Sequence, residues 1–371
     1  MRKLRVALVA PSLDILGGQA VQADRLLRAW QGDDEVECRL IPVNPVPPGP
    51  LRHIRKVKYL RTVVTEATYL PSLVRQLADV DVAHVFSASY SSFLLAPLPA
   101  IVAARALGQP VILNYRSGEA PDHLARSRVA RIALSKVDLN VVPSRFLVEV
   151  FGQFGIGAAI IPNLVDSGRF RFRPRVPLMP RILSTRNLEP LYNVSCTLRA
   201  FKLVQNRVPD ATLTLVGIGA DEPALRKLVQ QLGLRGVTFV GQVAPHEIAD
   251  FYAAHDVYLQ SPNIDNMPTS ILEAYASGLP VVSTAAGGIR AILTHGEHGL
   301  LASVNDHHTL AEHVLSLLES PALVEKLTRA ALDTCADYTW SAIREQWLRA
   351  YRSVLRAEAR TPNPARAHDT I

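Results

Sequence analysis

The sequence is poor in cysteine and has no long apolar run, and each shortage excludes a class of protein. Only three of its 371 residues are cysteines, and Cys38, Cys196 and Cys335 are too far apart for a disulfide scaffold or a zinc module. We expect free thiols in a reducing compartment. No stretch approaches the roughly 18 apolar residues of a membrane span. A composition that is 48% hydrophobic and 20% charged excludes a disordered or collagen-like chain.

The first residues do not resemble a secretory leader. The apolar run VALVA is short and is followed by Pro11 and Asp14, whereas a leader needs roughly 7 to 15 apolar residues. A buried first strand and a cytoplasmic location are therefore expected, with peripheral attachment to the inner face of a membrane as an open alternative. The surplus of 40 Lys and Arg over 33 Asp and Glu favours anionic partners without choosing among them.

Short apolar runs alternate with helical patterns along the whole chain, which predicts parallel sheets covered by helices on both faces. At roughly 100 to 200 residues per domain, the length predicts two doubly wound α/β domains. The segment 167–180, rich in proline and arginine, has the composition of a linker. The predicted helix nearest the start covers 20–30, and the predicted strands are 5–10, 82–86, 111–114, 139–142, 181–184, 211–216, 237–240, 257–259 and 281–283.

A basic amphipathic helix is predicted around residues 51–61. Apolar residues recur there every third position, and the basic residues between them are Arg52, Arg55, Lys56, Lys58 and Arg61. Such a helix suits an anionic membrane or a phosphate-bearing acceptor, but a surface helix with solvated charges is an equally open interpretation. Nucleic acid is disfavoured, because no aromatic residues interleave with the basic ones.

Two glycine turns follow predicted strands, where ligands of such sheets bind. Gly17, Gly18 and Gln19 open the first helix, whose free N–H groups can attract an anion. Gly217 and Gly219 form a turn that can lie near a nucleotide or be purely structural.

The most informative segment is 261–288. It predicts a helix from Pro268 to Ser277, ended by Gly278, that is apolar on all sides except at Glu273. A buried carboxylate needs a hydrogen-bonding partner. That partner is either an arginine of the same domain or the diol of a sugar, and Asp265, in the preceding loop, is predicted to face the same cleft.

The segment DNMPTSILEAYASGLPVVSTAAGG, residues 265–288, resembles the signature of glycosyltransferase family 4, whose members are retaining enzymes of the GT-B fold. The motif acidic-x7-Glu falls on Asp265 and Glu273. Further matches run along the chain in the family's order: Gly17-Gly18, the strand VDVAHV with His84, Pro143-Ser144, Pro162-Asn163 with Asp166, and Gly278-x-Pro280-Val281-Val282.

The resemblance implies two Rossmann-like domains facing a central cleft. The first, 1–166, would bind the acceptor, and the second, 181–339, the nucleotide-diphosphate sugar, with the last helix, 340–359, crossing back to the first. It also implies roles for single residues. Glu273 would bind the ribose, Asp265 would orient the hexose, and Gly18 and Gln19 would donate N–H groups to the diphosphate. The backbone beside the sugar-phosphate would be that of Asn266, Met267, Pro268 and Thr269.

The chain departs from the family pattern at its cations. Asn187 and Tyr192 take the places of an Arg and a Lys that contact the diphosphate, and Arg116 replaces a histidine. Our hypothesis is that Arg186 contacts the diphosphate and Tyr192 donates a hydrogen bond; Arg116 and Arg290 are further candidates to compensate. His84 either faces the cleft on the acceptor side, as Arg116 would, or is a core histidine.

The expected activity is the transfer of a hexosyl unit from a nucleotide-diphosphate sugar to a glycan or lipid-linked acceptor, with retention and without a metal. Asp79 and Asp81 imitate a metal-binding Asp-x-Asp motif, but they lead directly into a strand. Cell-surface polysaccharide and glycolipid synthesis are both open. The alternatives are a catalytically weakened binding partner of the same fold and a nucleotide-sugar epimerase.

Overall fold

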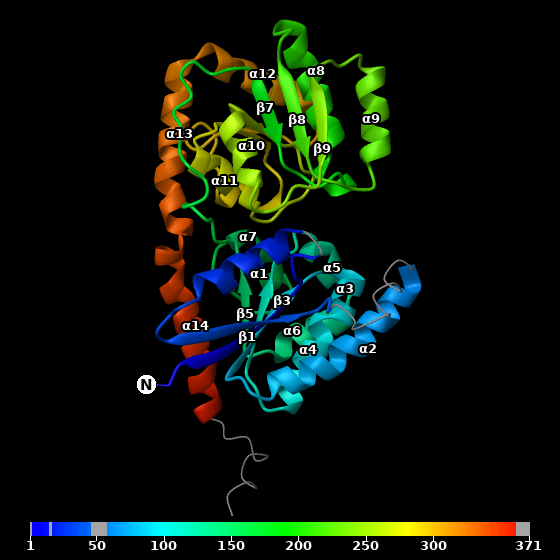
Figure 1. The fold of residues 1–371 in the computed structure, drawn as a ribbon, viewed down its shortest axis with the longest axis vertical. Coiled ribbons are helices and arrows are strands. Elements are labelled where there is room, and N and C mark those ends of the chain that lie inside the picture. Colours follow the sequence, from blue (N-terminus) through cyan, green and yellow to red (C-terminus); the bar gives the residue numbers. More distant parts are fainter. Residues whose placement is uncertain (1, 15–16, 46–57, 361–371) are drawn as a thin grey trace, which may run out of the picture. The chain divides into compact units, whose positions relative to one another are not determined.

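The structure is a computed structural model that describes residues 2–14, 17–45 and 58–360, with backbone alone at 58–64 and 357–360. The chain divides into two compact units, one of residues 1–164 with 343–371 and one of residues 165–342. Figure 1 shows that each unit consists of a sheet with helices packed around it.

The first unit contains a six-stranded parallel sheet of order β2-β1-β3-β4-β5-β6. Its strands are β1 (Leu4–Ala10), β2 (Val36–Pro42), β3 (Val82–Ser87), β4 (Val111–Tyr115), β5 (Leu139–Val142) and β6 (Ala159–Ile160). Its helices are α1 (Gly18–Ala29), α2 (Lys58–Leu77), α3 (Tyr90–Leu95), α4 (Pro97–Ala106), α5 (Ala120–Arg126), α6 (Arg128–Lys136), α7 (Arg145–Gln153) and most of α14 (Trp340–Arg360).

Side chains of the central strands alternate between the two faces of this sheet. Ala83 and Val85 of β3 join the core formed with α2, α4 and α6. The side chain of His84, between them, points to the other face, where Trp347 and Tyr351 of α14 lie against it. The last helix therefore covers one face of the first sheet.

The second unit repeats the pattern with a parallel sheet of order β12-β11-β10-β7-β8-β9. Its strands are β7 (Arg181–Ser184), β8 (Thr212–Val216), β9 (Val237–Gly241), β10 (Val257–Leu259), β11 (Val281–Thr284) and β12 (Leu300–Ala302). Its helices are α8 (Val194–Arg207), α9 (Glu222–Gln231), α10 (Ile248–Ala254), α11 (Thr269–Ser277), α12 (His307–Glu319) and α13 (Pro321–Cys335), with 3-10 turns η2 (Pro190–Tyr192), η3 (Gly287–Ala291) and η4 (Ala336–Tyr338).

The helix α11 is buried along its whole length. Its apolar side chains pack with α10, η3 and one face of the sheet, and Gly278 ends it at a φ of 74°, which glycine adopts without strain. Pro268 is extended and precedes the first helical residue, so the helix begins one residue later than predicted.

The segment predicted as a linker packs on the second unit through its arginines. Arg175 is buried and donates to four carbonyl oxygens, those of Arg173, Tyr252, His255 and Ser277. The last three of these residues lie in or next to α10 and α11. Arg175 therefore connects segment 167–180, called the strap below, to both helices. None of the described helices is long and apolar enough to span a bilayer.

The two doubly wound parallel α/β sheets confirm the predicted fold class. Each predicted strand is present within one residue at either end, and the helix predicted at 20–30 is α1. Three strands were not predicted: β2, β6 and β12. All three are edge strands.

Candidate functional site

The carboxyl end of the second sheet has its switch point between β7 and β10. These strands are neighbours, and the chain continues from β7 to one side of the sheet and from β10 to the other. Ligands of doubly wound sheets bind at such a point. The loops that leave it, 185–193 and 260–268, carry Arg186, Tyr192 and Asp265, and Glu273 follows on α11.

Glycines let neighbouring turns approach these loops backbone to backbone. A Cβ on Gly217 would lie 2.3 Å from the carbonyl oxygen of Arg186, and one on Gly219 2.1 Å from that of Leu188. On the other side, a Cβ on Gly287 would lie 2.2 Å from the carbonyl oxygen of Asp265, which accepts a hydrogen bond of 3.0 Å from the N–H of Gly288. Close contacts between backbone atoms therefore hold the loops 185–193 and 260–268 in place.

Glu273 is held by a tyrosine. Its side chain is 7% exposed, and its Oε2 accepts a hydrogen bond of 2.9 Å from the Tyr252 hydroxyl on α10. That hydroxyl also lies 2.7 Å from Thr185 Oγ1. Burial and the charge of Glu273 raise the pKa of Tyr252 well above its ordinary value, so the phenol keeps its proton and donates a hydrogen bond to the carboxylate.

Asp265 is paired with Arg186. The guanidinium forms an ion pair with Asp265 and donates to Ser270 Oγ over 3.2 Å, and its carbon lies 4.1 Å from the centre of the Tyr192 ring. Burial opposes the charge, but Asp265 and the neighbouring tyrosines outweigh it and raise the pKa of Arg186. The predicted cation, its aromatic neighbour and the loop carboxylate therefore form one cluster.

The residues between the two carboxylates line the start of α11. Asn266 and Met267 are buried, and the N–H of Asn266 donates to Asp265 Oδ1 over 2.8 Å. Pro268 precedes the helix and Thr269 is its first residue, and the first N–H groups of the helix have no helical acceptor. Arg290, in η3, is exposed.

The predicted residues of the first unit lie around the corresponding end of its sheet. Gly17 caps α1, which has no acidic residue in its first turn, and Gly18 is exposed. Gln19 Nε2 donates to the Ser87 carbonyl at the end of β3 over 2.9 Å, and Arg116 follows β4.

His84 is fully buried, as a core histidine would be. Its Nε2 lies 2.9 Å from Asn114 Nδ2 and its Nδ1 3.0 Å from the Tyr351 hydroxyl. Burial and the nearby charge of Arg116 lower the pKa of His84 well below its ordinary value, so the imidazole is neutral.

Two predicted features remain, the basic helix around residues 51–61 and the Asp79–Asp81 pair. Residues 46–57 lie outside the described part of the chain, so the predicted basic helix is described only from Lys58, where α2 begins, and the side chains of Lys58 and Arg61 are not described. Asp79 and Asp81 form ion pairs with Arg5, and Asp81 also with Arg2. Among residues 2–14, 17–45 and 58–360 no group of three potential metal ligands occurs.

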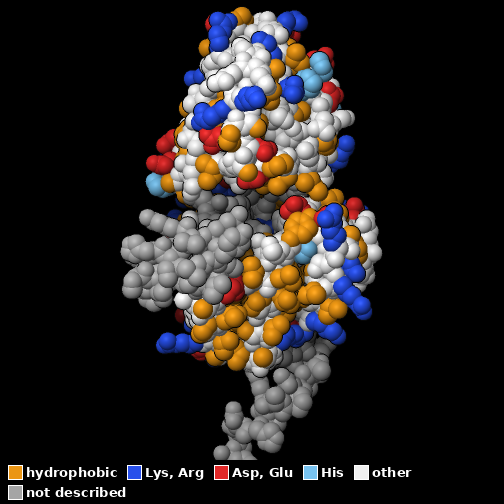
Figure 2. All heavy atoms as spheres, turned by 90° about the vertical axis from the view of Figure 1, so that its right-hand side faces the viewer, with side chains coloured by type: hydrophobic (Ala, Val, Ile, Leu, Met, Phe, Trp, Pro, Cys, Tyr) orange, Lys and Arg blue, Asp and Glu red, His pale blue; other side chains and the backbone are white. Residues whose placement is uncertain are grey.

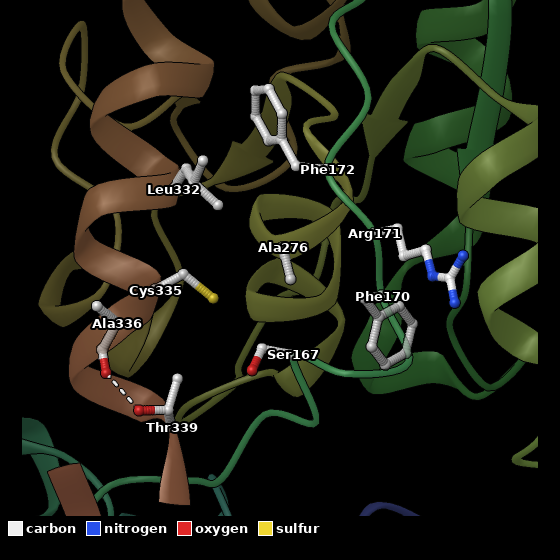
Figure 3. A pocket seen from close by; sticks show the side chains of 9 residues that line it. All are labelled: Ser167, Phe170, Arg171, Phe172, Ala276, Leu332, Cys335, Ala336 and Thr339. Atoms are coloured by element: carbon white, nitrogen blue, oxygen red, sulfur yellow. Dashed lines mark hydrogen bonds between the residues drawn. The ribbon is translucent and has the colours of Figure 1, made fainter. Parts of the chain in front are cut away.

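Sequence reasoning missed the partners of the carboxylates, Tyr252, Thr185 and Ser270, and it missed a pocket in the second unit. This pocket of about 400 Å³ is lined by Leu332 and Cys335 of α13, Ala276 of α11 and the strap residues Ser167 and 170–172 (Figure 3). Burial raises the pKa of Cys335 to about 11, so its thiol stays protonated. No predicted site residue lines the pocket.

Comparison with known proteins defines the class. The profile "Glycosyltransferase Family 4" matches residues 16–169, and "Glycosyl transferases group 1" matches residues 171–334. The chain belongs to glycosyltransferase family 4 and has the GT-B fold, which confirms the resemblance seen in the sequence.

Individual relatives are distant. The chain is 28% identical to an exopolysaccharide phosphotransferase of Streptomyces coelicolor over 73% of this chain and 29% of that protein. It is 31% identical to a phosphatidyl-myo-inositol mannosyltransferase of Mycobacterium leprae over 60% of this chain and 59% of that protein. The structure of Anabaena HepE in complex with UDP-glucose has a TM-score of 0.76 at 18% identity and covers 94% of this chain and 100% of that one.

Proposed function

We propose that this protein transfers a hexosyl unit from a nucleotide-diphosphate sugar to a glycan or lipid-linked acceptor with retention of configuration and without a metal. The observation that carries the proposal is the pair of carboxylates at the switch point of the second sheet. Glu273 and Asp265 lie on one loop-and-helix unit, and each is held by a hydrogen bond or ion pair.

In this proposal the two carboxylates grip the two sugars of the donor. Glu273, oriented by Tyr252, accepts hydrogen bonds from the ribose hydroxyls, and Asp265 orients the hexose. The backbone of Asn266 to Thr269 and the N-terminus of α11 lie along the sugar-phosphate, and Gly17, Gly18 and Gln19 donate N–H groups to the diphosphate.

Negative charge accumulates on the leaving diphosphate, so a fixed cation near it stabilises the transition state. Arg186 suits this role because its partners already fix its orientation, and the Tyr192 ring covers its face. A donor phosphate oxygen takes the proton of the acceptor hydroxyl on the face that the leaving group departs from. The protein contributes orientation and charge stabilisation and forms no covalent intermediate.

A uridine donor is the first candidate, since the HepE structure contains UDP-glucose. The test is a thermal-shift panel of nucleotide sugars and UDP, followed by product analysis. We expect one donor to stabilise the wild type and Glu273→Gln to lose this effect, whereas Glu325→Gln, at an exposed ion pair on α13, keeps it. Equal donor stabilisation of the Glu273→Gln variant and the wild type would refute the role of Glu273.

Product analysis separates the alternatives. Transfer with a retained anomeric configuration in the presence of EDTA supports the proposal. Binding without turnover would indicate a binding partner that has lost activity. Release of free sugar with an altered configuration, without any acceptor, would indicate an epimerase.

We also propose that the first unit docks on an anionic membrane through an apolar surface. This surface, the apolar helix face, consists of exposed side chains on α2, α3, α4 and α6: Leu70, Val74, Tyr90, Leu94, Leu95, Val102, Val129 and Ile132. They are eight of the fourteen large hydrophobic residues that are exposed among the described side chains, so exposure of apolar side chains is concentrated here. Figure 2 shows hydrophobic side chains gathered on this unit with Lys and Arg at the margins.

The charge around this face supports a bilayer as its occupant. The described side chains of these helices include five cations, Arg75, Arg105, Arg128, Arg131 and Lys136, and one carboxylate, Glu66. In the sequence, the basic segment 52–61 includes the first residues of α2, which begins at Lys58. Apolar side chains ringed by cations suit the headgroup region of an anionic membrane.

Flotation with phosphatidylglycerol-containing and pure phosphatidylcholine vesicles tests this surface. We expect binding to the anionic vesicles only, and loss of it in the Val102→Asp/Ile132→Asp double variant but not in Val304→Asp on the second unit. Equal flotation of both variants would refute the proposal. So would a wild-type dimer in light scattering that the double variant abolishes, because a second copy would then cover the face.

A further inference from the structure

Arg116 is a half-buried cation that has no anionic partner among the described residues. Its Nε donates to Asn114 Oδ1 over 3.0 Å, its Nη1 donates to Asn163 Oδ1, and its guanidinium carbon lies 5.2 Å from the centre of the Phe86 ring. All three neighbours are neutral. Among the described residues no carboxylate lies within ion-pair distance of Arg116, and its Nη2 has no hydrogen-bond partner.

Two other arginines that are buried from solvent lie close to a carboxylate, as Arg116 does not. Arg186 pairs with Asp265. Arg175 is surrounded by four carbonyl oxygens and lies 4.0 Å from the Asp256 carboxylate. Burial lowers the pKa of Arg116 to about 9, which still leaves it charged at pH 7. A desolvated charge is normally paired, so its counter-ion is expected to come from a ligand.

The guanidinium is held in place by a chain of buried groups. Asn114, His84 and Tyr351 are all fully buried. Because His84 is neutral, its Nε2 accepts from Asn114 Nδ2 and its Nδ1 donates to the Tyr351 hydroxyl. This fixes the Asn114 amide with its oxygen toward Arg116. Residues of α14, β3 and β4 thus orient one cation at the carboxyl end of the first sheet.

The surroundings favour an anion. β4 is the neighbour of β3, whose end is tied to the start of α1 by the hydrogen bond from Gln19 to Ser87. The positive end of the α1 dipole therefore belongs to the same edge of the sheet. The free edge of a guanidinium suits the paired oxygens of a phosphate or carboxylate.

We propose that Arg116 binds a phosphate or carboxylate group of the acceptor, and that Asn114, His84 and Tyr351 are positioning residues for it. This rests on the proposed function, since it identifies the acceptor as an anionic molecule. The same chemistry could be offered by the donor diphosphate, and the test separates the two sources.

The experiment measures the thermal shift caused by inorganic phosphate, against chloride at equal ionic strength, and by UDP. Phosphate is expected to stabilise the wild type. Arg116→Met should weaken the apparent phosphate affinity at least about tenfold and keep the UDP shift. The control Arg199→Met, at an exposed arginine of the second unit, should keep both shifts.

Asn114→Asp tests the positioning chain. It places a carboxylate against Arg116, so the folded protein should lose the phosphate shift by internal competition, which a merely structural role of Asn114 does not predict. Retention of the phosphate shift in Arg116→Met, or in a folded Asn114→Asp variant, overturns the anion site. A wild type that phosphate does not stabilise overturns it as well, because Arg116 then binds no anion.

The UDP arm identifies the source of the anion. Loss of the UDP shift in Arg116→Met would assign the anion to the donor and overturn the acceptor assignment. Glu273→Gln should show the reverse pattern, with the UDP shift lost and the phosphate shift kept. If UDP fails to stabilise even the wild type, the proposed donor site fails while the phosphate comparison still decides the role of Arg116.

Discussion

Two buried tyrosines allow a matched test of how Glu273 is positioned. Tyr252 donates to the Glu273 carboxylate over 2.9 Å. Tyr275 lies on α11, and its hydroxyl donates to the Ile292 carbonyl over 3.1 Å. Both side chains are fully buried, so replacement by Phe removes one hydroxyl from a similar environment in each case. The variants differ in the charge of the lost acceptor and in the number of contacts, because the Tyr252 hydroxyl also lies 2.7 Å from Thr185 Oγ1 and 3.2 Å from the Ser270 carbonyl oxygen.

The expected losses of stability differ accordingly. A hydrogen bond to a charged group contributes about 1.5–3 kcal/mol and a neutral one about 0.5–1.5 kcal/mol. Tyr252→Phe should therefore lower the free energy of unfolding more than Tyr275→Phe. Urea unfolding followed by circular dichroism measures both values.

Donor binding separates positioning from stability. Without Tyr252, the Glu273 carboxylate loses a contact that orients it toward the ribose. A loss of about 0.7–1.4 kcal/mol corresponds to roughly three- to tenfold weaker binding of UDP, measured by calorimetry. Tyr275→Phe should leave the dissociation constant unchanged. Equal dissociation constants in the two variants would refute the idea that Tyr252 orients Glu273.

Three further predictions concern stability. Arg175→Met should lower the free energy of unfolding by about 3–5 kcal/mol, because it leaves buried carbonyls without their donor; a loss below 1 kcal/mol in urea unfolding would contradict the strap's role. Gly219→Ala should destabilise the protein and weaken UDP binding, since its Cβ would meet the Leu188 carbonyl at 2.1 Å. The control Gly152→Ala, in open space within α7, should instead stabilise the protein by about 0.5–1 kcal/mol. Equal unfolding free energies for the two variants would argue against the close packing of the glycine turn. The free energy of unfolding should fall as the pH drops below about 6.5, because His84 takes up a proton in the unfolded chain, whereas the buried imidazole, with its lowered pKa, stays neutral. This effect contributes up to about 1.4 kcal/mol per pH unit. A free energy of unfolding that is level between pH 7.5 and 5.5, with the same slope in wild type and His84→Asn, would show that this histidine does not control the pH dependence.

The central strands could be predicted from the sequence because they are buried on both faces and read as continuous apolar runs. Of the four edge strands, β9 could be predicted, whereas β2, β6 and β12 could not. β2 carries Glu37 and Arg39 among its apolar residues, and β6 and β12 are two and three residues long. An edge strand is protected on one side only, so its composition resembles that of a loop.

The candidate site was predictable as far as local chemistry goes. The pattern around Glu273 indicates a buried carboxylate in a helix, and the structure agrees. Its partner Tyr252 lies on another helix, and the pairing of Arg186 with Asp265 joins two loops. Such contacts depend on the order of strands in the sheet, which a single sequence does not reveal. Arg175 was hidden for a related reason, since an arginine in a proline-rich segment looks like a solvated linker residue.

The last helix has a consequence for the order of synthesis. Residues 343–360 belong to the first unit, where Trp347 and Tyr351 pack against His84 and Tyr351 against Trp30. On the ribosome, the sheet at the beginning of the chain must wait for the whole second unit to be translated before this face is covered. Until then this face has no covering helix, so a nascent chain halted before position 343 leaves Trp30 and His84 without their contacts to α14.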